Sequence, residues 1–239
     1  MKNFMQEPIV KAAAVLALGP IIAAFVAAYA FYQIRAASND ISVTGSARET
    51  VISDHAKWVV NVSAHTGLYD QAAGYAALAR GLDVVKKKIA ESGFAEPEIN
   101  TTSVFEQYGQ NSAVTGYQMS QDVIVQSDDV KKVQSSANQV QTMQGVGYLV
   151  RTSTVEYSYT KLDEMRIKLL SSAIKDAKAR AEAIMKEGNQ QTGLLKNASS
   201  GVVQVLAKNG VDISDYGSYD TQSMEKDVMV TVRAVFGIK

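Results

Sequence analysis

The chain has 239 residues, and its 24 lysines and arginines are balanced by 24 aspartates and glutamates. This balance excludes a global bias toward nucleic acid or anionic lipid, and we expect no nucleic-acid partner. Cysteine is absent, which excludes a disulfide framework, thiolate catalysis and zinc or iron–sulfur sites with cysteine ligands.

An apolar stretch without charge, Ala12 to Tyr32, lies near the start of the chain. A helix of about 20 residues spans roughly 30 Å, the thickness of the hydrocarbon core of a bilayer. Aromatic residues cluster at its far end, as they do at membrane interfaces. We therefore predict a cytoplasmic tip and transmembrane anchor over residues 1–37, with the lipid bilayer as a partner. A cleaved secretory signal, for which Ala28-Tyr29-Ala30 offers a cleavage pattern, and a buried globular helix are the alternatives.

Small residues recur on one face of this span. Gly19, Ala23 and Ala27 follow a small-xxx-small pattern, which lets membrane helices approach closely. We predict that these three residues mediate association between membrane helices. Because alanine is common in any membrane helix, ordinary span composition is the alternative interpretation.

Alternation of apolar and polar residues predicts two strands at the start of the body, 41–45 and 56–66. We expect them to pair as a hairpin, with Asp54 near the turn. An apolar stripe at helical spacing predicts a helix over 68–92, which ends at Gly93. Its predicted buried face comprises Ala72, Tyr75, Leu78, Ala79, Leu82, Val85 and Ile89.

The middle of the body contains two further predicted strands, 99–107 and 115–126, the second with one buried and one wet face. A helix is predicted from Val130, because Ser127-Asp128-Asp129 resembles a helix N-cap region. The sequence from 148 to 159 is rich in Thr, Val and Tyr, which favours a strand.

The longest predicted helix, 161–186, follows, with Thr160 as its candidate N-cap. Its apolar stripe comprises Leu162, Met165, Leu169, Ala173, Ala177, Ala181 and Ile184. Two last strands, 201–207 and 227–236, are separated by a long polar loop, 209–225. Hairpins with interspersed helices predict an α+β fold class: an N-terminal transmembrane helix, then a body (residues 38–239) of antiparallel strands covered by helices.

Several short motifs in this body, taken in order, resemble one protein family. They are Ile41-Ser42-Val43-Thr44-Gly45, Thr101-Thr102-Ser103-Val104, Gly116-Tyr117, a helix bearing Arg166, Ala173 and Asp176 to Glu182, and the later Gly188 and Gly193. Their order and spacing resemble the SIMPL-domain family over about Asn39 to Lys239. Departures from the family pattern, which mark a divergent member, are Ala47, Ser53-Asp54 and Met165.

The resemblance implies an α+β fold in the bacterial cell envelope and self-association into homo-oligomers, which a periplasmic immunogenic relative builds as a large ring-like assembly. It also implies a link to oxidative-stress tolerance in some members and to kinase signalling in an animal member, and it supplies no catalytic residues. Lys2 and Lys11 precede the span and Arg35 follows it, which favours a cytoplasmic N-terminus. We therefore expect a single-pass protein of the bacterial inner membrane with its C-terminal body in the periplasm.

Residues suited to metal or nucleophilic chemistry are few. His55 and His65, the only histidines, lie ten residues apart at the two ends of a predicted strand, too far apart to share a metal. The sequence contains no His-Glu-x-x-His motif, phosphate loop or dinucleotide glycine motif. We therefore expect no catalytic site, no metal and no cofactor.

Two functional hypotheses follow from these patterns. The first is a non-enzymatic, membrane-anchored subunit that self-assembles into a homo-oligomeric, ring-like scaffold. The second is a monomeric or dimeric module that senses a small ligand or partner through the 209–225 loop, because long loops are often functional. An enzyme is a distant third.

Overall fold

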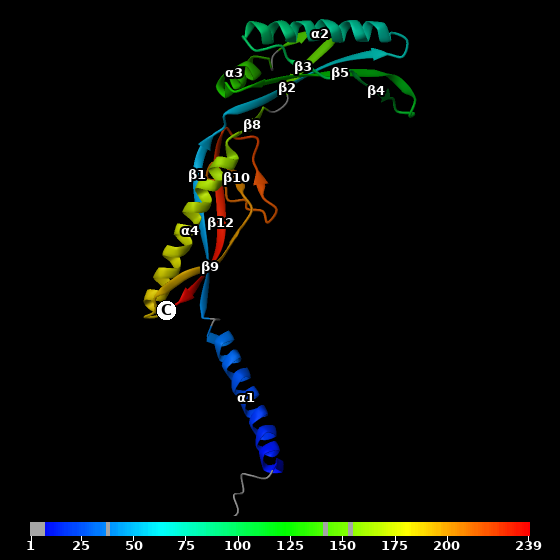
Figure 1. The fold of residues 1–239 in the computed structure, drawn as a ribbon. Helices are drawn as coiled ribbons and strands as arrows, with labels where there is room; N and C mark the ends of the chain where they lie inside the picture. The colour runs from blue at the N-terminus through cyan, green and yellow to red at the C-terminus, as the bar shows by residue number, and fades with distance from the viewer. Residues whose placement is uncertain (1–7, 37–38, 141–142, 153–154) are drawn as a thin grey trace, which may run out of the picture. The chain divides into compact units, whose positions relative to one another are not determined.

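The computed structural model describes residues 8–36, 39–140, 143–152 and 155–239. Its contacts divide the chain into two compact units. The first unit comprises residues 1–46, 172–201 and 231–239, and the second comprises residues 47–171 and 202–230. Within the described residues, four helices and mainly antiparallel strands build these units (Figure 1), which confirms the predicted α+β class.

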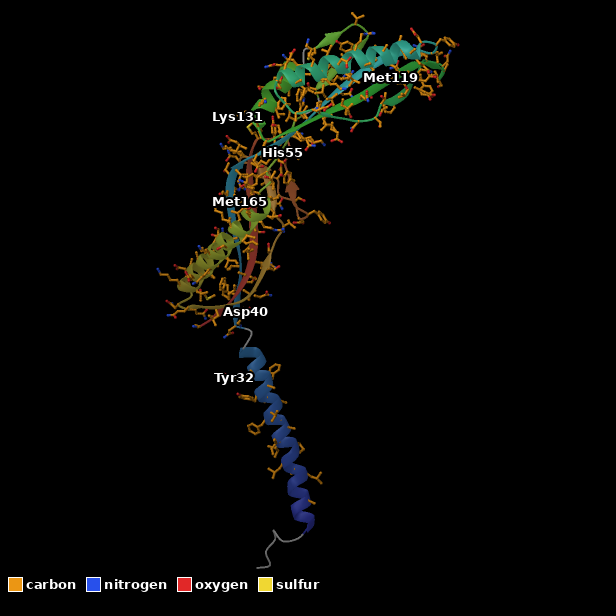
Figure 2. All side chains as sticks on the ribbon, turned by 45° about the horizontal axis from the view of Figure 1, so that its top comes forward. Tyr32, Asp40, His55, Met119, Lys131 and Met165 are labelled. Carbon is orange, nitrogen blue, oxygen red and sulfur yellow. The ribbon has the colours of Figure 1, made fainter. Side chains whose placement is uncertain are left out.

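The first helix, α1 (Pro8–Ala36), contains the apolar stretch. Its window Leu16–Gln33 is long and apolar enough to cross a membrane, and none of that window is buried. Tyr32, for example, projects outward from α1 (Figure 2) and is 70% exposed. A membrane anchor and the apolar part of a signal sequence share these properties.

A long antiparallel pair forms the centre of the second unit. β2 (His55–Gly67) pairs with β5 (Val114–Ser127) from Ala56 opposite Ser127 to Gly67 opposite Gly116. The strand order around this pair is β3-β5-β2-β7-β6, with β4 beside β5 and β8 beside β2. The bounds of these shorter strands are β3 (Glu98–Ile99), β4 (Ser103–Tyr108), β6 (Gln144–Gly145), β7 (Tyr148–Thr152) and β8 (Glu156–Ser158).

Helices α2 (Gln71–Glu91) and α3 (Val130–Val140) pack on one face of this seven-stranded sheet (Figure 1). The even-numbered side chains of β2 point to this face, and Trp58, Val60 and Val62 are fully buried there. The predicted alternation of β5 is confirmed, because Met119, Val123 and Val125 are also buried in this core. The predicted strand 148–159 is divided into β7 and β8, and residues 153–154 lie outside the described residues.

α2 buries only part of its predicted apolar stripe, namely Leu78, Val85 and Ile89. The buried residues are Gly74, Ala77, Leu78, Gly81, Val85 and Ile89, whereas Ala72, Tyr75 and Ala79 are exposed and Leu82 is half-buried. The reason is close approach of the helix to the sheet. A Cβ at Gly81 would lie 2.7 Å from Val62 Cγ1 and 2.8 Å from the Tyr148 ring. Gly93 has a φ of 71° just beyond the helix, which confirms it as the stop.

Further strands complete the second unit. The first half of β12 (Glu225–Ile238) pairs with β10 (Gln204–Ala207), and β11 (Ser218–Tyr219) pairs in parallel with β10. The second half of β1 (Asp40–Ile52) lies on the other side of β12. Their core comprises Val51, Met165, Leu169, Val205, Val228 and Val230.

β1, β12 and the long helix α4 (Leu162–Glu187) continue into the first unit. There β9 (Thr192–Ser200), a strand that the sequence did not predict, pairs with the second half of β12. The apolar residues buried in this unit include Val43, Ala173, Ala177, Ala181, Met185, Val232, Ala234 and Phe236. Ile184 is 54% exposed, so the last buried position of the α4 stripe is Met185 and not Ile184.

The predicted hairpin between the first two strands is wrong. β1 does not stop at Gly45 but runs on to Ile52, and β1 and β2 belong to different sheets. Ser53 and Asp54 connect them. The carboxylate of Asp54 accepts hydrogen bonds from the N–H of Thr160 at 2.7 Å and from its hydroxyl at 2.8 Å. Asp54 therefore orders the segment that leads into α4. Thr160, the candidate N-cap, uses its hydroxyl as a hydrogen-bond donor to Asp54.

Candidate functional site

A close contact between β1 and α4 in the first unit explains why Gly45 and Asp176 occur in the short motifs that resemble the SIMPL family. A Cβ at Gly45 would lie 2.2 Å from the carbonyl oxygen of Ala173 and 2.4 Å from the nitrogen of Ala177, so only glycine fits. The next N–H, that of Ser46, donates to Asp176 Oδ2 at 2.8 Å. Arg180 Nε donates to the same oxygen at 2.8 Å. These residues form a strand–helix joint, which is a structural role.

The Thr101–Val104 motif lies at a break in an edge strand of the second unit. β3 pairs with β5 up to Ile99 opposite Val123, and β4 resumes with Ser103 opposite Ser120. Three residues of one strand therefore face two of the other, which is the pattern of a bulge. The predicted single strand 99–107 is thus divided in two.

The strand break opens a polar cleft of about 430 Å³. It is lined by Ile99, Asn100, Thr101, Ser103, Ser120, Gln121 and Asp122. Asn61 Nδ2 donates to Asp122 Oδ1 at 2.7 Å, and Gln121 Nε2 donates to the carbonyl of Asn100 at 2.8 Å. These bonds fix the side chains of Asp122 and Gln121 at the cleft. We call these seven lining residues the strand-break cleft.

Two of the lining residues, Ser103 and Ser120, lie on the face of the sheet that α2 and α3 do not cover. Because residues paired across strands share a face, the register places Ser63, Ser120 and Ser103 in one row across β2, β5 and β4. The next row along contains His65, Gln118 and Phe105. Adjacent rows lie about 6.6 Å apart along the strands.

The groups of this surface are suited to hydrogen bonding. Its groups are hydroxyls, amides, one carboxylate and the 60% exposed ring of Phe105. A serine nucleophile requires a base within hydrogen-bond reach. His65 is engaged elsewhere, because its Nδ1 accepts from Gln107 Nε2 at 2.9 Å. A hydroxyl-rich cleft of this kind orients a ligand by hydrogen bonds.

Comparison with known families identifies the body. The model of one family, described as SIMPL, protein of unknown function (DUF541), matches residues 41–236. The chain belongs to the SIMPL family. No curated protein matches the chain in a sequence comparison. The resemblance inferred from the short motifs is thereby confirmed.

The two histidines of this SIMPL chain are placed apart, at opposite ends of β2. His55 Nδ1 pairs with Asp128 at 2.8 Å, and its Nε2 lies 3.4 Å from Gln126 Oε1. Over residues 8–36, 39–140, 143–152 and 155–239, no group of three or more His, Asp or Glu side chains is arranged to hold a metal ion.

The 209–225 loop of the SIMPL body is held at its base. Gln204 Nε2 donates to the carbonyl of Ser214 at 2.6 Å, and the N–H of Asp220 donates to the carbonyl of Val205 at 2.8 Å. The tip of the loop exposes apolar side chains: Val211 at 78%, Ile213 at 60% and Tyr216 at 97%. Hydrogen bonds to β10 therefore hold the base of the loop in place, while its tip presents exposed apolar side chains.

A fully buried lysine, Lys226, lies beneath this loop. Its ammonium donates to the backbone carbonyl of Asp220 and lies 3.7 Å from the Asp220 carboxylate. Burial lowers the pKa of Lys226, and the charge of Asp220 opposes this. For Asp220, burial disfavours the charge, but hydrogen bonds from Ser223 and Gln222 and the charge of Lys226 outweigh it, so its pKa is lowered. The pair fastens the loop to β12.

Asp227, the next residue, is buried and fastens the other end of the loop. It accepts hydrogen bonds from Thr50 Oγ1 at 2.6 Å and from the N–H of Asn209 at 3.0 Å. Arg48 lies 3.5 Å from the same carboxylate. The bond from Thr50 is the main reason that the pKa of Asp227 lies below its usual value. Sequence reasoning missed both buried charges, because the sequence alone marks them only as polar residues at the start of a strand.

The predicted association residues Gly19, Ala23 and Ala27 all lie on α1 and are exposed. A Cβ at Gly19 would meet nothing within 4 Å, so the residue is open to a partner helix. Their role in helix association stays a prediction, since it concerns a second chain.

The strand-break cleft was not predicted as a site. Its signal in the sequence was weak, because the polar run Asn100-Thr101-Thr102-Ser103 stands in a predicted strand that contains other polar residues as well. Asp122 and Asn61 are far apart along the chain, and only the β2–β5 register brings them together.

Proposed function

We propose that this SIMPL protein is anchored in the bacterial inner membrane by α1, carries its body in the periplasm, and assembles into a ring-like homo-oligomer that acts as a non-enzymatic scaffold. The observation that carries this proposal is a pair of different free strand edges in the first unit. The exposed apolar surface of α1 supports the anchor.

The two edges belong to β1 and β9. On β1 the N–H of Ser46 already donates to Asp176 at 2.8 Å, so the free part of that edge excludes Ser46. In the part of the chain that the structure describes, each of these strands pairs only with β12. All residues of β9 from 194 to 200 are exposed, and Leu194 is 81% exposed. An exposed edge of this length offers unpaired backbone groups to another chain.

Two different edges favour a ring. Pairing β1 of one copy with β9 of the next is a heterologous contact, and heterologous contacts generate rings when the rotation closes. Such a ring gathers the α1 helices, where the small residues Gly19, Ala23 and Ala27 allow close approach.

The mass of the detergent-extracted full chain tests this assembly, and we expect a multiple of the subunit mass at micromolar concentration. Ala198→Pro sharpens the test. The N–H of Gly201 donates to Thr231 at 2.9 Å, so by antiparallel alternation the N–H of Ala198 points to the free edge. Proline there removes an outward donor and leaves the β12 ladder intact.

We expect Ala198→Pro to release monomers and Ala198→Ser, which keeps the donor, to retain the parental mass. A monomeric parent, or an Ala198→Pro variant that keeps the parental mass and thermal stability, contradicts assembly through β9. N-terminal sequencing of the cellular protein tests the anchor separately, since a mature chain that begins after Ala30 has lost it.

A second function, capture of a partner by the 209–225 loop, is favoured by the apolar tip of that loop. Deleting the loop would remove the hydrogen bonds of Ser214 and Asp220, so point variants are the better test. Changing Val211, Ile213 and Tyr216 to serine should abolish partner capture and leave the oligomer mass unchanged. Loss of the oligomer in this variant would instead place the loop in the scaffold.

A further inference from the structure

We propose that the strand-break cleft binds a neutral, hydroxyl-rich glycan. The inference rests on the second unit alone and does not depend on the assembly proposed above. It explains why hydroxyls, amides and one oriented carboxylate gather where the edge strand is interrupted.

The lining of the cleft matches a polyol. Thr101, Ser103 and Ser120 have hydroxyls that form no hydrogen bond with any other part of the chain that the structure describes. Hydroxyls both donate and accept, as sugar hydroxyls do. None of the seven lining residues is a lysine, arginine or histidine, which disfavours a phosphate or other anion.

The carboxylate of Asp122 is oriented before any ligand arrives. One of its oxygens accepts from Asn61 at 2.7 Å, which leaves the other to accept from a ligand hydroxyl. Gln121 is likewise held by the carbonyl of Asn100. Side chains fixed in this way lose little conformational entropy on binding.

Phe105 supplies an apolar platform beside these polar groups. It lies two residues beyond Ser103 on the same face of β4, about 6.6 Å along the strand. Its ring is 60% exposed, although it stands in a row with the polar Gln118 and His65. A sugar ring presents C–H groups on one face and hydroxyls at its rim. Its C–H face can therefore pack on the Phe105 ring while its hydroxyls form hydrogen bonds in the strand-break cleft.

An amine is the competing ligand, because a single carboxylate also attracts a cation. The glycan is favoured because one oxygen of Asp122 is already engaged and the remaining lining groups are uncharged. The test therefore includes spermidine as an amine probe.

Isothermal titration calorimetry on the full chain tests the proposal, with N-acetylglucosamine tetrasaccharide and maltotetraose as probes. The first represents amino-sugar chains of the cell wall and the second represents glucans. The detergent must have no sugar head group, because an alkyl glycoside is itself a neutral saccharide and would compete.

We expect one of the two saccharides to bind. Phe105→Ala should weaken binding about tenfold, the effect of losing about 1.4 kcal/mol of aromatic contact. Asp122→Asn should weaken it about fivefold, because a hydrogen bond to a charged acceptor becomes a neutral one. The matched controls are Tyr69→Ala, at a fully exposed aromatic residue before α2, and Asp83→Asn, on the exposed surface of α2, and both should bind as the parent does.

No heat from either saccharide at millimolar concentration, binding of spermidine in their place, or equal weakening by the control variants overturns the glycan assignment. Phe105→Ala and Asp122→Asn should keep the oligomer mass, and Ala198→Pro should keep saccharide binding. The two proposals therefore fail independently of one another.

Discussion

Replacing Gly45 by alanine tests the strand–helix joint of the first unit. The added Cβ would lie 2.2 Å from the carbonyl oxygen of Ala173, whereas an ordinary van der Waals contact begins at 3.4 Å. Because the obstacle is helix backbone and not a movable side chain, α4 and β1 must separate by about 1.2 Å, the difference of those two distances.

The cost of this separation has two parts. Overpacking costs about 1–3 kcal/mol. The movement also breaks the 2.8 Å hydrogen bond from the N–H of Ser46 to the Asp176 carboxylate, and a bond to a charged group contributes about 1.5–3 kcal/mol. We expect a total loss of about 2.5–6 kcal/mol, which lowers the Tm of a chain of this size by about 5–24 °C.

Thermal unfolding followed by circular dichroism measures this loss. Gly67→Ala is the matched control, because a Cβ at Gly67 meets nothing within 4 Å, and its Tm should stay close to the parental value. Adding Ala177→Gly to Gly45→Ala should not restore stability, since the backbone contact with Ala173 remains. An unchanged Tm for Gly45→Ala, or full rescue by Ala177→Gly, would refute the reasoning.

Three further predictions concern the second unit. Asp227→Asn should lower the free energy of unfolding by about 1–2 kcal/mol in urea titrations, because a neutral amide replaces the charged acceptor of the 2.6 Å bond from Thr50. The lowered pKa values of Asp220 and Asp227 mean that the unfolded chain binds protons more readily than the folded chain. Stability should therefore be fully present above about pH 4 and fall as the pH falls through the folded-state pKa values, with a smaller fall in Asp227→Asn. Gly116→Ala should destabilise the β2–β5 pair, measured as a lower Tm than that of Gly67→Ala, because its Cβ would lie 2.3 Å from the Thr66 carbonyl oxygen.

The sequence predicted most reliably the elements with a regular apolar periodicity. The alternation of β2 and β5 and the long stripe of α4 were found where expected, because each pattern is set by local geometry. The order and spacing of short motifs also identified the SIMPL family, which the family comparison confirmed. The strand β9 was missed because its residues are exposed and carry no alternation of burial.

Strand partners and helix faces depended on contacts distant in sequence. The hairpin was mispredicted because the local sequence at Ser53 and Asp54 carries no signal that the chain passes there from one sheet to another. The buried face of α2 was predicted only in part. Leu78, Val85 and Ile89 are buried as expected, but Gly74 and Gly81, which a hydrophobic stripe ignores, also face the sheet and allow the helix to approach it closely. Side-chain apolarity and close backbone approach together select that face.

The sequence by itself determined that the chain begins with an apolar helix able to span a bilayer, that an α+β body follows, and which family that body belongs to. These features follow from composition and local periodicity. Only the tertiary structure decided that the Gly45 and Asp176 motifs form a packing joint, and that Asn61 and Asp122 meet at the strand-break cleft. The physical reason is that side chains far apart along the chain are brought together only by strand register and helix packing, which no single stretch of sequence encodes.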